Sequence, residues 1–164
     1  MKPQLLAALF VGCLVATAGL LSAAYAPADK AATKEYARIE GTWNLVSLQM
    51  DGKKMPEKSF KGTQLICKGR DFTFVQGKES LKGTFKVDVS KTPRQMDATF
   101  TNGPEAGKTA LCIFELTDDT YRICVALVGK PRPTAFASKA GTGHVLEVFK
   151  RAKADAKAKD GGGK

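Results

Sequence analysis

Short stretches of alternating apolar and polar residues follow one another from Gly41 to Arg151, and turn signals separate them. In residues 81–88 the alternation places Gly83 and apolar side chains on one face and Lys, Thr and Asp on the other. A period of two with one wet face is typical of a half-buried antiparallel strand. Runs of this kind predict about eight strands, at residues 42–49, 63–67, 72–76, 81–88, 95–100, 109–116, 120–128 and 144–151. Because neighbours in sequence can pair through short connections, we expect an all-β fold, a small up-and-down antiparallel barrel, with a two-sheet sandwich as the alternative.

Hairpin geometry also predicts which residues face each other. We expect Cys67 opposite Phe72, and Phe114 opposite Ile123, because each pair then shares one face of its hairpin. The inward face would line a lumen for a small apolar or amphipathic ligand, with a fully packed core of the same residues as the alternative. The predicted lining residues are Phe74, Phe85, Met96, Phe100, Phe114 and Ile123.

The N-terminus resembles an export signal. One cation, Lys2, precedes an apolar run over residues 5–21, and small residues continue to Ala28. This layout predicts a secretory signal peptide over residues 1–28 and a mature chain that is secreted or periplasmic, without a transmembrane segment. Three cleavage points fit the small-residue spacing, after Ala24, Ala26 and Ala28.

A lipoprotein interpretation competes with simple secretion, because Gly12 precedes Cys13 as a small residue precedes a lipidated cysteine. The apolar run before Cys13 is short, and the residues after it stay apolar instead of turning polar. We therefore favour cleavage and release over lipidation.

Three further segments divide the 164-residue chain. Residues 29–39 predict a short lead-in helix, and residues 40–151 form the expected barrel domain. Residues 152–164 predict a disordered Lys/Ala/Gly tail. The tail would be attracted to an anionic envelope surface, but it lacks the aromatic residues that single-strand nucleic-acid binders use, so no specific nucleic acid is expected as a partner.

The start and end of the strand series resemble the lipocalin pattern. Gly41 and Thr42 precede Trp43, and two cations, Lys150 and Arg151, end the last strand. This resemblance implies that Trp43 plugs the barrel base and that Arg151, or else Lys150, lies across its ring. Such a contact contributes about 0.5–2 kcal/mol.

A second set of short motifs extends over nearly the whole mature chain. These motifs are 41–43 with 51–53, 82–85, 90–93 with Asp97, 107–109, 119–124, 132–136 and 150–151. In these stretches the chain more closely resembles a family of small secreted domains of unknown function that is abundant in planctomycete bacteria. It departs from the family pattern at Cys112, where glycine is usual, and at Ala135, where an acid is common. The resemblance implies no activity, and ligand binding of the lipocalin kind is a further analogy.

Cys67, Cys112 and Cys124 remain after signal removal. An oxidising compartment favours one disulfide and one free thiol. Alternation turns Cys67 and Cys112 inward and Cys124 outward, which disfavours a Cys112–Cys124 bridge, although a turn longer or shorter by one residue would place those two opposite each other. Three buried free thiols are the alternative.

No residue pattern predicts a catalytic site, a cofactor or a metal site. The sole histidine, His144, has no partner histidine, and the cysteines lack zinc-ligand spacing. Asp118 and Asp119 lie where a hairpin turn favours Asp. We therefore expect a non-enzymatic protein, with an enzyme that uses His144 as the third-ranked hypothesis.

Two arginines form the most suggestive polar pair. Arg94 and Arg132 lie beside prolines in rigid loops, so two guanidinium groups would be able to clamp a carboxylate or phosphate at the barrel mouth. The favoured alternative is that Arg132 anchors its own loop on strand-end carbonyls. The sequence thus predicts a non-catalytic binding domain, and the alternative is an envelope interaction module that binds a protein or an anionic polymer through its loops and basic tail.

Overall fold

The computed structural model describes residues 27–153. The predicted signal peptide with Cys13, up to residue 26, and the predicted tail beyond residue 153 lie outside the described residues. The predictions for those segments therefore stay predictions.

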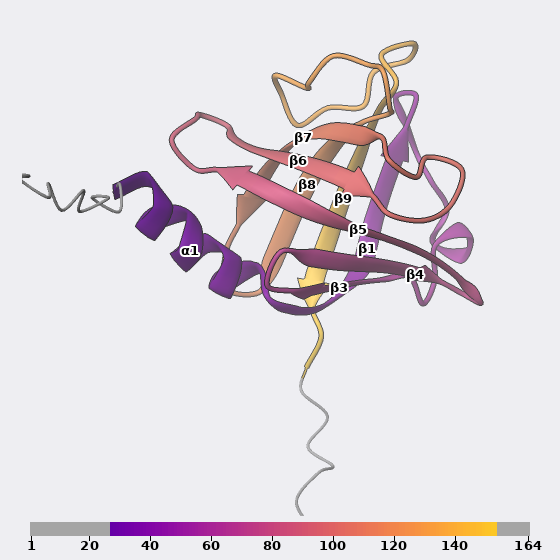
Figure 1. The fold of residues 1–164 in the computed structure, drawn as a ribbon. Coiled ribbons are helices and arrows are strands. Elements are labelled where there is room, and N and C mark those ends of the chain that lie inside the picture. The colour runs from indigo at the N-terminus through magenta and orange to yellow at the C-terminus, as the bar shows by residue number, and fades with distance from the viewer. Residues whose placement is uncertain (1–26, 154–164) are drawn as a thin grey trace, which may run out of the picture.

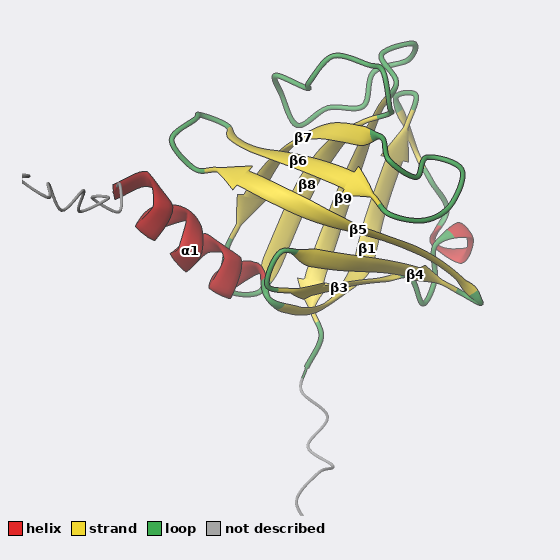
Figure 2. Cartoon of the chain, in the orientation of Figure 1, coloured by secondary structure: helices red, strands yellow, loops and turns green. Residues whose placement is uncertain are grey.

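One helix precedes a series of strands (Figures 1 and 2). The predicted lead-in helix is present, and the predicted strands agree with the observed ones to within two residues at each end. The elements are α1 (Pro27–Ile39), β1 (Gly41–Met50), β2 (Lys53–Lys54), the 3-10 turn η1 (Glu57–Ser59), β3 (Gln64–Lys68), β4 (Asp71–Gln76), β5 (Glu79–Asp88), β6 (Arg94–Phe100), β7 (Thr109–Leu116), β8 (Thr120–Ala126) and β9 (His144–Arg151).

The strands close into a barrel. From β3 to β9 each strand pairs antiparallel with the next, β3 also pairs with β1, and β9 pairs with β1 to complete the ring. The two-residue β2 only extends β1 as a hairpin, so eight strands form the barrel wall. In Figure 1, β5, β6 and β7 run across the front of β8, β9 and β1, as the tilted strands of a closed barrel do. The up-and-down barrel is confirmed, and the two-sheet sandwich is not formed.

The hairpin registers follow the predicted ones. Cys67 pairs with Phe72, and Phe114 pairs with Ile123. The composition of residues 132–136 also suits a short irregular strand, but this segment forms no strand. β8 and β9 pair directly with each other, which leaves no free edge on that hairpin for the intervening chain.

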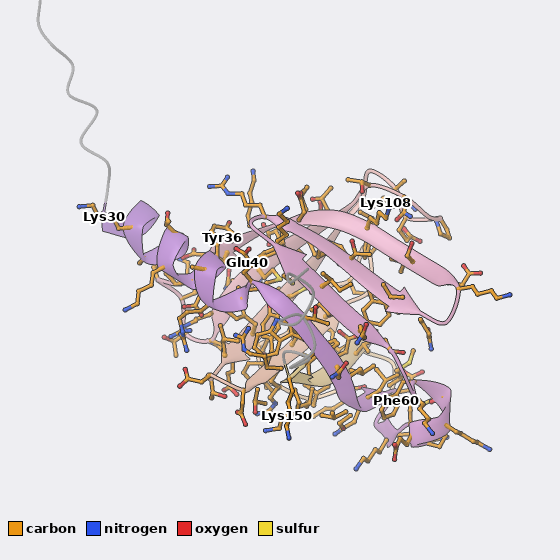
Figure 3. The ribbon with its side chains drawn as sticks, turned by 90° about the horizontal axis from the view of Figure 1, so that it is seen from below. Lys30, Tyr36, Glu40, Phe60, Lys108 and Lys150 are labelled. Carbon is orange, nitrogen blue, oxygen red and sulfur yellow. The ribbon has the colours of Figure 1, made fainter. Side chains whose placement is uncertain are left out.

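Helix α1 packs against the barrel end where β1 begins (Figure 3). Ile39 is fully buried, and the Tyr36 ring lies 5.5 Å from the ring of Phe85. The Tyr36 hydroxyl accepts a hydrogen bond of 3.1 Å from the backbone N–H of Val87 on β5. The helix therefore covers this end, which we call the base.

A cluster of buried rings forms the floor of the barrel above the helix. The Tyr121 ring lies 5.4 Å from Trp43, 6.0 Å from Phe114 and 6.4 Å from Phe149, and all four residues are buried. The Trp43 indole N–H donates a 2.8 Å hydrogen bond to the carbonyl of Ile39. This bond satisfies the polar atom of a buried ring and ties the end of α1 to the floor.

Candidate functional site

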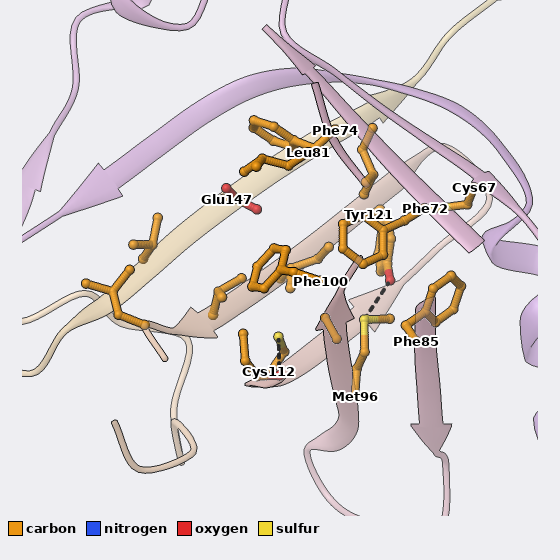
Figure 4. A pocket seen from close by; sticks show the side chains of 17 residues that line it. Cys67, Phe72, Phe74, Leu81, Phe85, Met96, Phe100, Cys112, Tyr121 and Glu147 are labelled. Carbon is orange, nitrogen blue, oxygen red and sulfur yellow. Dashed lines mark hydrogen bonds between the residues drawn. The ribbon is translucent and has the colours of Figure 1, made fainter. Parts of the chain in front are cut away.

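A cavity of about 260 Å³ lies inside the barrel between the aromatic floor and the end opposite the helix. Side chains from β3 to β9, together with Leu127, line it (Figure 4). Leu81 and Leu127 are lining residues that remain 37% and 51% exposed. The cavity therefore opens to solvent beside these two leucines.

Small residues leave this space unfilled. Ala98 on β6 pairs with Ala110 on β7, and both side chains line the cavity. On β5, Gly83 lies under the ring of Phe72, because a Cβ at Gly83 would come within 2.5 Å of that ring. The Phe72 ring in turn meets Phe100 edge-on at 5.9 Å. The two alanines thus leave space that larger side chains would fill, and Gly83 lets the Phe72 ring lie against the wall.

Five of the six predicted lining residues border the cavity: Phe74, Phe85, Met96, Phe100 and Ile123. Their role in binding a ligand stays a prediction. Phe114 requires a correction, because it is fully buried in the floor against Tyr121 and does not border the cavity. Its side chain faces the barrel interior as expected, but it lies in the floor, between the cavity and the base.

Arg94 and Arg132 do not form the predicted clamp. Arg94 lies at the base, where its Nη1 donates to the Glu35 carboxylate of α1 at 2.6 Å. Arg132 donates from Nη1 to the carbonyls of Met96, at 2.9 Å, and Cys112, at 2.7 Å, and from Nη2 to the Asp97 carboxylate. The clamp prediction is therefore wrong. The alternative, in which Arg132 anchors its loop on main-chain carbonyls, is confirmed, although these carbonyls lie within β6 and β7 and not at strand ends.

The anchored loop, residues 127–143, covers part of the outer wall. Its Phe136 packs against a small second core of Ile113, Cys124 and Leu146 from β7, β8 and β9. The Arg122 guanidinium lies 4.5 Å from the centre of the Phe136 ring. The loop consequently buries outward-facing apolar residues without adding a strand.

The three described cysteines are free and buried, so the expected disulfide is wrong and the alternative of three thiols holds. Cys112 pairs with Val125, and Cys124 faces away from the lumen as alternation predicts. Burial raises the pKa of Cys67 to about 12 and raises that of Cys112 as well. Both thiols border the cavity as neutral, weakly polar groups.

Sequence reasoning missed Glu147 on β9, the one charged residue among residues 27–153 that borders the cavity. Its strand partners are Ile123 on β8 and Leu48 on β1. Glu147 keeps part of its surface open to the lumen, but apolar protein surrounds the carboxyl, and desolvation raises its pKa from 4.5 to about 7. Alternation along β9 would have revealed it, since Val145 and Phe149 flank Glu147 on the inward face.

The described residues offer little for other chemistry. Within residues 27–153, no group of three or more His, Cys, Asp or Glu side chains lies together as a metal site would. His144 Nε2 donates a hydrogen bond of 3.0 Å to the carbonyl of Pro131, in the loop that follows β8. No helix in this part of the chain is long and apolar enough to cross a bilayer.

These features define a closed eight-stranded antiparallel β-barrel protein with an internal apolar cavity. No family model and no curated protein matches the chain. Among solved structures, the chain is similar to a DUF4847 family protein from Bacteroides vulgatus, with 14% identity and a TM-score of 0.46 over 74% of this chain and 99% of that one. A likeness at this level carries no argument here, and the resemblance to secreted planctomycete domains stays a prediction.

Proposed function

We propose that this protein is a secreted or periplasmic binding protein that holds one small apolar or amphipathic molecule in its lumen and acts without catalysis. The cavity between the floor and the rim carries this proposal. The signal-peptide pattern at the N-terminus supports the proposed location.

The size of the cavity suits a small ligand. An apolar cavity of about 150 Å³ holds benzene, and sites for drug-sized molecules begin near about 300 Å³. At about 260 Å³ the lumen lies between these values. The expected ligand is therefore larger than a single ring and smaller than a typical drug.

The wall favours burial of hydrocarbon. Four phenylalanine side chains line the cavity, and Met96 and Ile123 add flexible and branched apolar surface; the four are Phe72, Phe74, Phe85 and Phe100. Each Å² of apolar ligand surface that leaves water contributes about 25 cal/mol before the costs of ordering the ligand. Shape and burial would hold such a ligand, with few directional contacts.

The alternative of an envelope interaction module finds less support in the described residues. That hypothesis rests on the loops and on the basic tail, which lies outside the described residues, and two loop cations, Arg94 and Arg132, are engaged in contacts within the chain. The lumen therefore remains the favoured binding site.

The proposal is tested with the neutral fluorescent dye N-phenyl-1-naphthylamine and two matched variants. Ala98→Phe adds a ring inside the lumen, whereas Thr84→Phe adds the same ring on the exposed outer face of the adjoining strand. We expect wild type and Thr84→Phe to bind one dye per chain, and Ala98→Phe to bind at least about tenfold more weakly, because the new ring takes the ligand's place. Equal dye binding by both variants, or none by wild type, would refute lumen binding.

A further inference from the structure

A single carboxyl group faces an otherwise apolar lumen. Glu147 projects from β9 among the lining side chains, close to the labelled Leu81 and Phe74 in Figure 4. Within residues 27–153, no hydrogen bond or ion pair engages its carboxyl oxygens, whereas Glu35, the buried glutamate at the base, pairs with two arginines. The Glu147 side chain is partly buried among apolar groups and has no protein partner among the described residues, so a ligand whose polar group pairs with this carboxyl would gain a hydrogen bond that the empty lumen does not provide.

The rest of the wall shows what kind of partner fits. Among residues 27–153, no Lys, Arg or His lines the cavity, so the wall holds no positive charge that would neutralise the Glu147 carboxylate. The Tyr121 hydroxyl is already engaged, donating to Met96 Sδ at 3.8 Å. The remaining surface consists of aromatic faces, sulfur and hydrocarbon. Aromatic faces attract cations, so the rings that face the lumen favour the same ligand charge as the carboxylate does.

We propose that the lumen binds an amphipathic amine, whose ammonium group donates hydrogen bonds to the Glu147 carboxylate while its hydrocarbon body fills the apolar cavity. This inference rests on the proposed function and names the ligand class for it. A charge-assisted hydrogen bond is about twice as strong as a neutral one, and the low-dielectric lumen strengthens it further. The same carboxylate disfavours an anionic amphiphile such as a fatty acid, since two like charges would share one apolar site.

The pairing implies a specific dependence on pH. Protonation of Glu147 removes the charge that holds the ammonium group, so affinity for an amine falls as the pH falls through about 7. The other titratable lining groups are Cys67 on β3, Cys112 on β7 and Tyr121 on β8, and burial raises the pKa of each, so all three stay neutral near pH 7. Behind the wall, Arg132 is paired with Asp97.

The test uses three eight-carbon probes on the exported protein, measured by calorimetry at pH 8. These are n-octylamine, 1-octanol and octanoate, which differ in head group and share a chain. Glu147→Gln removes the charge in the lumen and keeps the shape of the side chain. Glu115→Gln makes the same change at an exposed glutamate on the outer wall and serves as the control.

We expect wild type and Glu115→Gln to bind octylamine at least about tenfold more tightly than octanol, and octanoate most weakly. Glu147→Gln should lose about tenfold or more in octylamine affinity, with octanol changed less than about twofold. Below pH 7 the wild-type affinity for octylamine should fall by up to about tenfold per pH unit, with that for octanol unchanged.

Equal binding of amine and alcohol, tightest binding of octanoate, or an octylamine affinity that Glu147→Gln leaves unchanged would each overturn the inference. If the dye still binds and Ala98→Phe still blocks it, the proposed lumen function survives that failure. If none of the three probes binds, the inference falls, and if the neutral dye also fails to bind, the proposed function falls with it.

Discussion

The guanidinium carbon of Arg151 lies 4.0 Å from the centre of the Trp43 ring, and the two residues are partners in the β1–β9 ladder that closes the barrel. The same guanidinium donates hydrogen bonds to the carbonyls of Arg38, Glu40 and Asp118. One side chain therefore joins the end of α1, the first and last strands and the turn between β7 and β8. Of the two cations that end the last strand, Arg151 makes the contact expected with Trp43.

We expect Arg151→Lys to lower the free energy of unfolding by about 1–3 kcal/mol, measured by urea denaturation. Lysine keeps the charge but cannot direct a planar fork of donors to three carbonyls while it lies flat on an indole. The control is Lys150→Met, which removes an exposed ion pair with Asp119 and should cost less than about 1 kcal/mol. Equal losses in the two variants would contradict the structural role of Arg151.

Gly83→Ala should lower the free energy of unfolding by more than about 2 kcal/mol. The added methyl group would overlap the Thr99 carbonyl and press against the Phe72 ring, which cannot move without disturbing Phe100. Thr84→Ala, at the exposed neighbouring position, should change the unfolding free energy by less than about 1 kcal/mol. A Gly83→Ala protein as stable as wild type would show that the close contact is not required.

Arg94→Met should weaken the packing of α1 on the barrel and leave the cavity unchanged. It leaves the buried Glu35 carboxylate with Arg38 alone, at 3.2 Å. We expect hydrogen exchange of the α1 amides to quicken by about tenfold, while dye binding stays as in wild type because neither Arg94 nor Glu35 borders the cavity. Lys108→Met removes an exposed ion pair with Glu105 and should leave α1 exchange unchanged. Unchanged α1 exchange in Arg94→Met would contradict the anchoring role of this residue.

Glu147→Gln should remove a pH dependence of stability. Folding raises the pKa of Glu147 from 4.5 to about 7, so the folded protein holds its proton where the unfolded chain has lost it. The wild-type protein then loses stability as the pH rises from about 4.5 to about 7, and above that range the deficit is on the order of 3 kcal/mol. Thermal melts without ligand should show the two proteins matched at pH 4 and the variant more stable at pH 8. A constant difference across this range would mean that the Glu147 carboxyl is well solvated.

Strand positions were predictable because alternation is a local property of the chain. β7 and β9 have the predicted bounds, and the inward parity of Met96, Phe100 and Ile123 agrees with the wall of the cavity. Residues 132–136 have a β-compatible composition, but they lie in the loop between β8 and β9 and form no strand. Whether such residues join a sheet depends on a free edge, and the direct pairing of β8 with β9 leaves none on that hairpin.

The sequence predicted which face of each strand the site residues occupy. It did not predict how deep in the barrel they lie or which residues they contact. Parity placed Phe114 inward, yet its level along the barrel axis depends on strand tilt and stagger, which put it in the floor. Arg94 and Arg132 do not form the expected clamp, because Arg94 pairs with Glu35 of α1 and Arg132 pairs with Asp97 of β6. Glu147 was overlooked because an isolated acid in a strand usually faces water.

The sequence by itself determined where the strands lie, which side of each strand is apolar, and how neighbouring strands pair, because period-two alternation and short turns act between residues close together in the chain. Only the tertiary structure decided that β9 returns to β1, that Ala98 and Ala110 leave a cavity, and that the Glu147 carboxyl borders it unpaired. Closure of the ring brings residues from distant strands to one level. The space and the charge environment at that level depend on all of those strands together.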